Sequence, residues 1–317
     1  MQHLDLQVIE RALQWANQGH VVWLCTVLTT FGSSPREPGA VMAACSKEQF
    51  IGSLSGGCIE ENFLERLEKE IHSASPVQLI HYGGEDDDTV RLPCGGRLSV
   101  LVERLEPSAD TLIHLEVVHA TLMGRRPLIR HVLLDGSRKR FIVPEGPGPA
   151  VTCDEHAAYL RIGPSLRLII AGISTVAVPC AQFAQALGFE VIVCDPRKEM
   201  RRDFNIPGVE VQAVLPSLFI ASGACHAATA IVALTHDPRI DDLAMIEAVR
   251  TDAFYIGVMG STKTSAQRAE RLRRSGGLTD TDIARIVMPI GLNLGSKTPA
   301  EIALATMADI MRTYRGK

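Results

Sequence analysis

Segments typical of buried strands alternate regularly with segments typical of amphipathic helices through the second half of the chain. Strands separated by one helix each need crossover connections, which are right-handed and produce a parallel sheet. The sequence therefore predicts a Rossmann-like, doubly wound parallel sheet in this half. The predicted strands are 167–171, 190–194, 228–235 and 254–258, and the predicted helices are 176–187, 240–249, 264–274 and 299–312.

The first half lacks this alternation and predicts a separate mixed α/β domain. Residues 143–150 hold three prolines and two glycines in eight positions, a density that no regular element tolerates. We expect a cofactor-binding domain over 1–145, a linker over 146–164 and the Rossmann-like domain over 165–317. The predicted helices here are 6–18, 58–74 and 112–122, and the predicted strands are 21–30, 40–44, 50–52, 77–82 and 98–102.

Charge and hydropathy exclude several classes of protein. The 317 residues carry 32 basic and 36 acidic side chains, so the chain lacks the basic surplus that non-specific nucleic-acid binding needs. Residues 168–189 and 211–236 are uncharged, but their prolines and polar residues favour buried strand–helix units over membrane spans. The N-terminal residues do not resemble a secretion signal, so we expect a cytoplasmic protein with mostly reduced cysteines.

A Gly-Gly pair precedes a cysteine at the predicted start of helix 58–74. In the sequence SLSGGCIE, Gly56 and Gly57 could offer backbone N–H groups to an anion, and the helix dipole would favour the thiolate form of Cys58. A glycine turn followed by a buried cysteine explains the pattern equally well.

A second cysteine lies in a similar turn, RLPCGGR. Cys94 precedes Gly95 and Gly96 and is flanked by two arginines that could stabilise a thiolate or hold a phosphate. The loop FGSSPREPG adds Ser33 and Arg36 as candidate anion ligands, although Ser, Pro and Gly are ordinary turn formers. No two of the eight cysteines have the C-x-x-C spacing of a zinc or thioredoxin-type motif.

The turn after the first Rossmann-like strand partly matches a dinucleotide-binding fingerprint. Gly172 follows that strand, and Asp195 ends the next strand 23 residues later, where a ribose-binding acid is expected. Ser174 replaces the second glycine, and its side chain would crowd a pyrophosphate. The pattern supports the fold more strongly than it supports NAD binding.

Eight motifs follow one another along nearly the whole chain: GSSPREPGAVM (32–42), GSLSGGCIEE (52–61), DDD (86–88), LPCGGRLSVLVE (92–103), LGFEVIVCDPR (187–197), THDPRIDD (235–242), YIGVMGS (255–261) and PIGLNLGSKTPAEIA (289–303). Together they resemble the XdhC/CoxI family of maturation proteins for molybdenum hydroxylases, and within it the chaperones of bacterial aldehyde oxidoreductases. Relatives commonly have Gly-x-Gly-His where this chain has Ser174 and Thr175, so the resemblance does not extend to nucleotide binding at that turn.

The resemblance implies a chaperone rather than an enzyme. It would bind and protect the molybdenum cofactor, a molybdopterin with or without its cytosine dinucleotide, support its sulfuration and insert it into a hydroxylase such as an aldehyde or xanthine oxidoreductase. The implied partners are that client, a cysteine desulfurase and the cofactor nucleotidyltransferase, in a homodimer with no nucleic-acid or membrane partner. Cys58 and Cys94 align with the family's SGGC and CGG cysteines, which are its implied cofactor and metal contacts.

Two other interpretations remain open. The second domain could belong to an NAD(P)-linked oxidoreductase, against which Ser174 argues. Alternatively, Cys58 or Cys94 could itself carry a persulfide in a sulfurtransferase. If the cofactor is a dinucleotide, Asp195 is the candidate ribose ligand beside Gly172.

Overall fold

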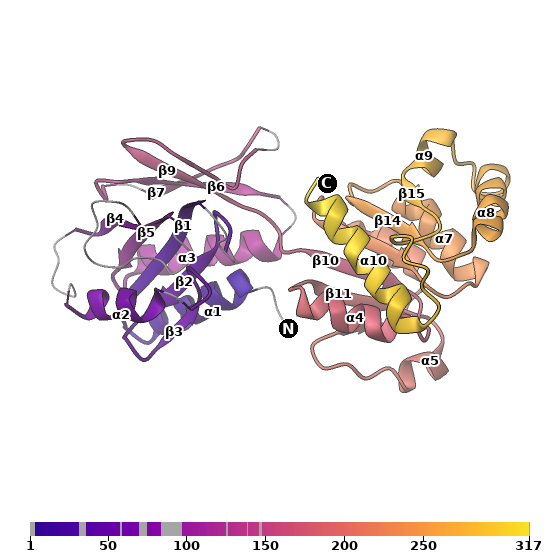
Figure 1. Cartoon of the computed structure of the whole chain (residues 1–317), viewed down its shortest axis with the longest axis horizontal. Coiled ribbons are helices and arrows are strands. Elements are labelled where there is room, and N and C mark those ends of the chain that lie inside the picture. Colours follow the sequence, from indigo (N-terminus) through magenta and orange to yellow (C-terminus); the bar gives the residue numbers. More distant parts are fainter. Residues whose placement is uncertain are drawn as a thin grey trace. The chain divides into compact units, whose positions relative to one another are not determined.

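The computed structural model describes residues 4–31, 36–57, 59–69, 75–83, 97–124, 126–137, 139–145 and 148–316. The chain divides into an N-terminal unit, Leu4–Pro164, and a C-terminal unit that contains Ser165–Lys317 (Figure 1). Each unit has hydrophobic clusters of its own.

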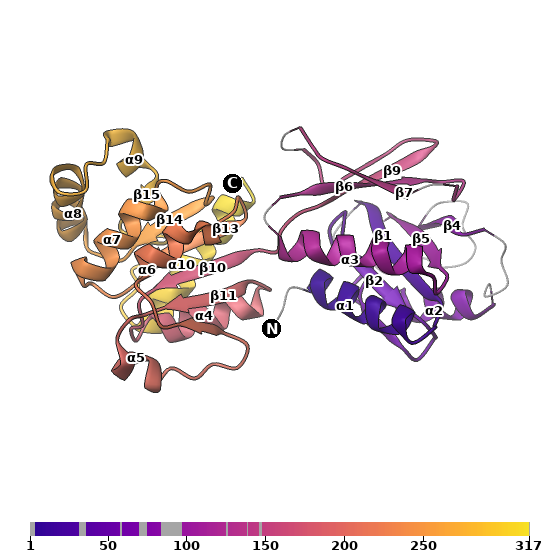
Figure 2. The ribbon, with the colours of Figure 1, turned by 180° about the vertical axis from the view of Figure 1, so that it is seen from behind.

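An antiparallel sheet and three helices form most of the N-terminal unit. The strands are β1 (Val22–Phe31), β2 (Val41–Ala44), β3 (Phe50–Gly52), β4 (Val77–Tyr82) and β5 (Arg97–Leu105), and the helices are α1 (Leu4–Asn17), α2 (Glu60–Lys69) and α3 (Ala109–Met123). The strand order is β3-β2-β1-β5-β4. Both faces of β1 are buried, because Trp23 and Cys25 pack in the cluster that contains α2 residues, whereas Val22 and Leu24 pack with α1 and α3. Helices α1 and α3 lie side by side in Figures 1 and 2.

A second antiparallel sheet completes this unit. Its strands are β6 (Leu128–Leu133), β7 (Lys139–Ile142), β8 (Val151–Cys153) and β9 (Ala157–Ile162), in the order β7-β6-β9-β8. Val132, Ala158 and Leu160 pack against Leu28 and Leu101 of the larger sheet.

The structure corrects the assignment of residues 146–164 to a linker. That segment contains β8 and β9, and β9 pairs with β6 from Ala157, opposite Leu133, to Ile162, opposite Leu128. The segment therefore belongs to the N-terminal unit. Strands of three and six residues beside a proline-rich turn are too short to show a clear alternation, so the proline density suggested a boundary too early in the chain.

A six-stranded parallel sheet organises the C-terminal unit. Its strands are β10 (Arg167–Ala171), β11 (Glu190–Cys194), β12 (Glu210–Gln212), β13 (Thr229–Ala233), β14 (Tyr255–Val258) and β15 (Ile286–Val287). The order β12-β11-β10-β13-β14-β15 is the 3-2-1-4-5-6 order of the Rossmann fold. The predicted fold class is confirmed.

Helices cover both faces of this sheet. They are α4 (Ala177–Ala186), α5 (Lys198–Arg202), α6 (Pro216–Phe219), the π-helical turn η1 (Ile220–Ala224), α7 (Pro238–Ala248), α8 (Thr262–Arg274), α9 (Asp280–Ala284) and α10 (Pro299–Tyr314). Leu168 and Ile170 of β10 pack with α4 and α10, whereas Ile169 and Ala171 pack with α7. Helix α10 crosses the face turned to the viewer in Figure 1, and α6 lies on the face seen in Figure 2.

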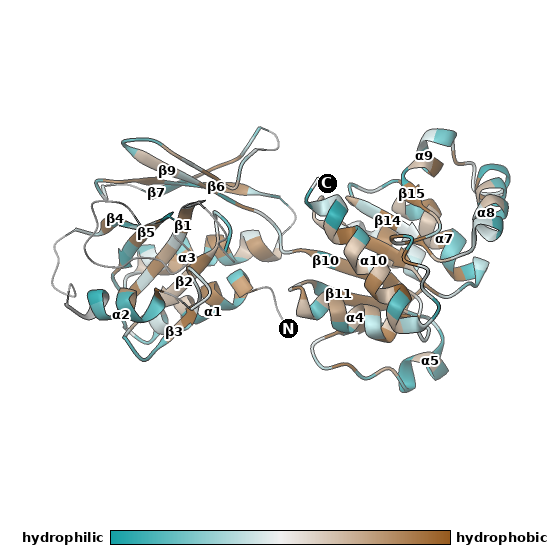
Figure 3. Ribbon diagram, viewed as in Figure 1, coloured by the Kyte–Doolittle hydropathy of each residue, from teal (hydrophilic) through white to brown (hydrophobic). Residues whose placement is uncertain are grey.

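The central strands are apolar (Figure 3), as expected for parallel strands buried on both faces. Among the described residues, no helix combines the length and the apolar character needed to cross a membrane.

Candidate functional site

The loop between β3 and α2 is organised around one buried carboxylate. Glu60 is only 7% exposed. Its oxygens accept six hydrogen bonds of 2.6 to 3.2 Å, from the backbone N–H groups of Leu54, Ser55, Gly57 and Ile59 and from the hydroxyls of Ser53 and Ser55. Burial alone would raise the pKa of Glu60, but the hydrogen bonds, led by that from Ser53, outweigh burial and lower the pKa to about 2.

The glycine amides predicted to bind an external anion are therefore engaged within the chain. Gly57 donates its N–H to Glu60, and Gly56 donates its N–H to Ser53 Oγ at 2.8 Å. Their φ angles of 112° and 84° lie in the region that favours glycine. The role predicted for these amides does not fit this arrangement. Side chains of the same loop, Glu60 and Ser53, accept the two N–H groups that were predicted to bind an external anion. The sequence signal was an acidic residue three positions after Gly57, as in a capping box.

Arg36 contacts this same loop. Its Nε donates to the carbonyl oxygen of Ser53 at 3.0 Å, and its Nη2 lies 3.7 Å from a carboxylate oxygen of Asp5. The structure thus brings Arg36 next to the Gly56–Gly57 turn, as a shared site in the first domain would require.

The remaining candidates of the first domain, Cys58, Cys94, Gly95, Gly96 and Ser33, lie outside the described residues, and their roles stay predictions. The two neighbours of position 58 both donate their N–H groups to Glu60 Oε2. The chain is therefore fixed on either side of the predicted cofactor-binding cysteine. Within the described ranges, no cluster of three or more His, Cys, Asp or Glu side chains is suited to a metal ion.

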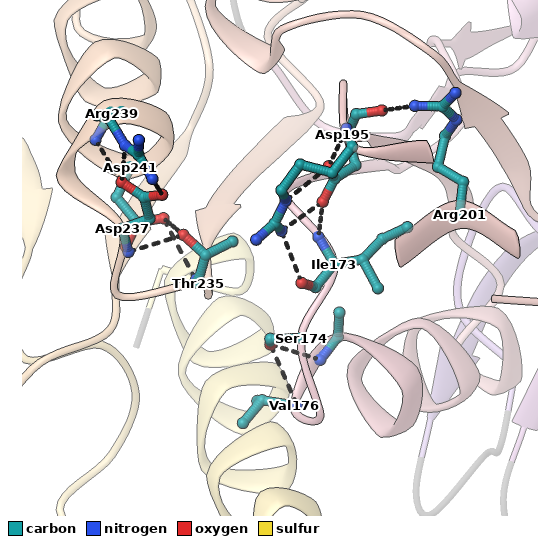
Figure 4. Close-up of polar contacts among 11 residues, drawn as sticks. Ile173, Ser174, Val176, Asp195, Arg201, Thr235, Asp237, Arg239 and Asp241 are labelled. Carbon is teal, nitrogen blue, oxygen red and sulfur yellow. Dashed lines mark hydrogen bonds and ion pairs between the residues drawn. The ribbon is translucent and has the colours of Figure 1, made fainter. Parts of the chain in front are cut away.

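In the C-terminal unit, Gly172 lies in the turn after β10, and its conformation there requires glycine. Gly172 has a φ of 86°, and a Cβ atom there would lie 2.1 Å from Thr235 Cγ2, so no larger residue fits. Ser174 Oγ accepts hydrogen bonds from the N–H groups of Val176 and Ala177 at 3.2 and 3.3 Å (Figure 4). A dinucleotide-binding fold would offer such amides to a pyrophosphate, but the N–H of Ala177, the first residue of α4, and that of Val176, which precedes it, already have a partner.

Asp195 has the predicted position beside Gly172 but not the predicted role. It is fully buried, and its carboxylate accepts the N–H of Ile173 at 2.7 Å together with the backbone N–H, Nε and Nη2 of Arg197 at 2.6 to 3.0 Å. Burial alone would raise the pKa of Asp195, but these bonds outweigh burial and lower it. Four bonds saturate the carboxylate. Direct ribose binding by Asp195, and the NAD recognition that depends on it, therefore do not fit this geometry.

The loop after β13 was not recognised as a site by sequence reasoning. Buried Asp241 accepts the hydroxyl of Thr235 at 2.6 Å and pairs with Arg268 at 3.3 Å. Asp237 donates its N–H to Thr235 Oγ1 at 3.0 Å, and its side chain caps the N-terminus of α7. His236, between them, has a φ of 65°, a left-handed conformation that is uncommon for any residue except glycine. The motif THDPRIDD was the available signal.

These features define a protein of two units. The first has antiparallel sheets and a Gly-Gly loop organised around the buried Glu60 carboxylate, and the second, which follows it in the sequence, has a Rossmann-type parallel sheet. The family description XdhC Rossmann domain matches residues 168–310, and the description XdhC and CoxI family matches residues 15–83. The chain belongs to the XdhC and CoxI family.

Individual relatives align over nearly the whole chain. A Bacillus subtilis (strain 168) protein described as a probable xanthine dehydrogenase subunit is 27% identical, over 92% of this chain and 93% of that protein. The molybdenum cofactor insertion chaperone PaoD of Escherichia coli (strain K12) is 24% identical, over 96% of this chain and 86% of PaoD. A crystal structure described as a xanthine dehydrogenase from Bacillus halodurans shares the fold, with a TM-score of 0.76, 22% identity and coverage of 100% and 97%.

Proposed function

We propose that this protein is a molybdenum cofactor insertion chaperone. The observation that carries the proposal is the alignment with PaoD over 96% of this chain, which spans both units. The Gly-Gly loop lies within that alignment. In this loop, Glu60 accepts the N–H groups of Gly57 and Ile59, the two neighbours of Cys58 in the sequence. The proposal assigns no catalytic residue.

In finer detail, we propose that the cofactor is a molybdopterin, including its cytosine dinucleotide form, and that the chaperone supports its sulfuration before insertion. Cys58 and Cys94 would contact the metal–sulfur core, because thiolates are soft ligands suited to such chemistry. Arg36 would face the anionic part of the same cargo. The partners would be a client molybdenum hydroxylase, a cysteine desulfurase and the cofactor nucleotidyltransferase, acting on a homodimer.

The test is cofactor content after anaerobic purification. The protein is oxidised in acid, the fluorescence of the released pterin is measured, and molybdenum is determined by elemental analysis. We expect both components in equal amounts, and a marked loss of both after co-expression with an excess of the apo client. Protein that is free of pterin and molybdenum, and that acquires neither when incubated with the isolated cofactor, would contradict the proposal.

The persulfide alternative predicts a different result. If the protein is a sulfurtransferase, incubation with a cysteine desulfurase and cysteine should add the mass of one sulfur atom to Cys58 or Cys94. The chaperone proposal expects no such adduct in intact-protein mass spectra, with the desulfurase itself as the positive control.

A further inference from the structure

The carboxyl ends of β10 and β13 meet at the point where the strand order of the C-terminal sheet reverses. Strands β11 and β12 follow on one side of β10, and β13, β14 and β15 on the other. In doubly wound sheets, ligands bind at this switch point, outside the carboxyl ends of the strands. The two turns touch here, since Thr235 Cγ2 lies against the α-carbon of Gly172.

Arg197 is held beside this point in a fixed orientation. Its Nε and Nη2 bind both oxygens of Asp195, and Nη2 also donates to the carbonyl oxygen of Ile173 at 3.0 Å. Nη1 makes no hydrogen bond within the described part of the chain, and 30% of the side chain is exposed. A guanidinium fixed along one edge, with its remaining N–H groups accessible, can bind an oxyanion at little entropic cost.

His236 lies in the loop after β13, whereas Arg197 follows β11, on the other side of β10. Hydrogen bonds to its neighbours hold its left-handed backbone in place, because Asp241 accepts from Thr235 and from the His236 N–H. Its side chain is exposed and makes no hydrogen bond to any described residue. Strained backbone that the surroundings hold in place is typical of functional sites.

The carboxylates around the two turns are paired with arginines of the chain. Asp195 pairs with Arg197, Asp237 with Arg239 and Asp241 with Arg268, and Arg201 donates to the carbonyl oxygen of Asp195. Asp195 is saturated by Arg197 and Ile173, and Asp237 is paired with Arg239 through both oxygens. Because Ser174 Oγ already accepts from the N–H groups of Val176 and Ala177, recognition here depends on side chains rather than on these two amides.

We propose that Arg197 and His236 bind the phosphate groups of a nucleotide-type ligand at this switch point, and that Asp195 and Asp241 act as positioning residues. This inference deepens the proposed function, since it assigns the nucleotide part of the cargo to the C-terminal unit. The site would bind the phosphate groups rather than the ribose, because Asp195, the carboxylate in the ribose-binding position, already accepts four hydrogen bonds.

Isothermal titration calorimetry of the full-length protein tests this, with cytidine diphosphate, inorganic pyrophosphate and cytidine as probes. We expect saturable binding of the first two and at least tenfold weaker binding of cytidine. Arg197→Gln should weaken binding of cytidine diphosphate at least tenfold. His236→Gly should weaken it several-fold without loss of folding, since glycine accepts a φ of 65°. The 2′-deoxy nucleotide should bind within twofold of the ribonucleotide.

Arg202→Gln is the matched control, because this arginine ends the short helix α5 that Arg197 precedes, and it pairs only with the exposed Asp203 among the described residues. Failure of the wild type to bind either phosphate probe would overturn the inference. Equal effects of Arg197→Gln and Arg202→Gln on binding of cytidine diphosphate, or unchanged binding by His236→Gly, would also overturn it. So would tenfold weaker binding of the 2′-deoxy nucleotide than of the ribonucleotide. The titration contains no molybdenum or pterin. Its failure is therefore distinguishable from failure of the chaperone proposal, which is judged on cofactor content.

Discussion

Glu60 is the side chain on which the Gly-Gly loop depends most. Its pKa is lowered from 4.5 to about 2 in the folded protein, so its contribution to the free energy of unfolding is present above pH 4.5 and lost as the pH falls toward 2. Glu60→Gln should lower the free energy of unfolding at pH 7 by about 2–3 kcal/mol. Urea unfolding at pH 7 and pH 3 checks this, and the gap between wild type and variant should shrink at pH 3.

Glu61→Gln is the control for this comparison, because Glu61 is the next residue of α2 and is exposed. It should change the free energy of unfolding by less than about 0.5 kcal/mol at either pH. A gap for Glu60→Gln that is equally large at both pH values would show that the carboxylate charge is not what holds the loop.

Cys25 and Cys194 should respond differently from Cys58 and Cys94 to replacement by alanine. Cys25 and Cys194 are buried, and burial raises the pKa of both thiols, that of Cys194 to about 12. Their variants should lose on the order of 1 kcal/mol of stability and keep their molybdenum and pterin. Cys94→Ala should lose most of both, and Cys58→Ala should come next. Circular dichroism first establishes that each variant is folded. Equal cofactor loss in Cys25→Ala and Cys94→Ala would refute this division.

At the scale of elements, Glu103 joins three strands. Its carboxylate on β5 pairs with the guanidinium of Arg130 on β6 and lies 3.2 Å from Lys139 Nζ on β7. Burial and the charge of Arg130 lower the pKa of Lys139 from 10.5 to about 7. Because the unfolded chain then binds this proton more tightly than the folded chain, the free energy of unfolding should rise as the pH increases from 7 toward 10.5.

Lys139→Met should remove that rise. Urea unfolding at pH 6.5 and pH 9 measures it, and Lys47→Met, which alters an exposed lysine of the same unit, should keep the wild-type pH dependence. Identical pH dependence in wild type and Lys139→Met would show that Lys139 titrates normally.

Several elements could be read from the sequence because burial leaves a clear pattern. Strands β10 and β11 begin and end where predicted, since in each a charged residue is followed by four apolar residues that lead into a turn. Strands β12 and β15, of three and two residues, are too short for any periodicity to show. The positions of Gly172 and Asp195 were predictable from their spacing. The saturation of Asp195 was not, because it depends on how Arg197 folds back over the turn.

The same limit applied to the Gly-Gly loop. A glycine pair before a helix indicates amides able to bind an anion, but a sequence does not show whether that anion is a ligand or a nearby carboxylate. Glu60 filled the position because the turn brings its side chain under four backbone N–H groups at once. Only three-dimensional geometry distinguishes these two cases.

At the scale of the whole molecule, the two units should fold independently. Their hydrophobic clusters share no residue, and the boundary lies between Pro164 and Ser165. Residues 1–164 and 165–317, expressed separately, should each unfold cooperatively, as followed by circular dichroism. The second fragment should also bind cytidine diphosphate as the full chain does. A fragment 165–317 without a cooperative transition would contradict this expectation.

The contact between Gly172 and Thr235 constrains how related sequences can vary. A side chain at position 172 would need a smaller residue at position 235, and it would have to tolerate a left-handed backbone. A larger residue at position 172 therefore requires a second substitution at position 235. Substitutions at the two positions should therefore be correlated across the family. Relatives with a larger residue at position 172 should have lost the threonine that orders the loop carrying His236.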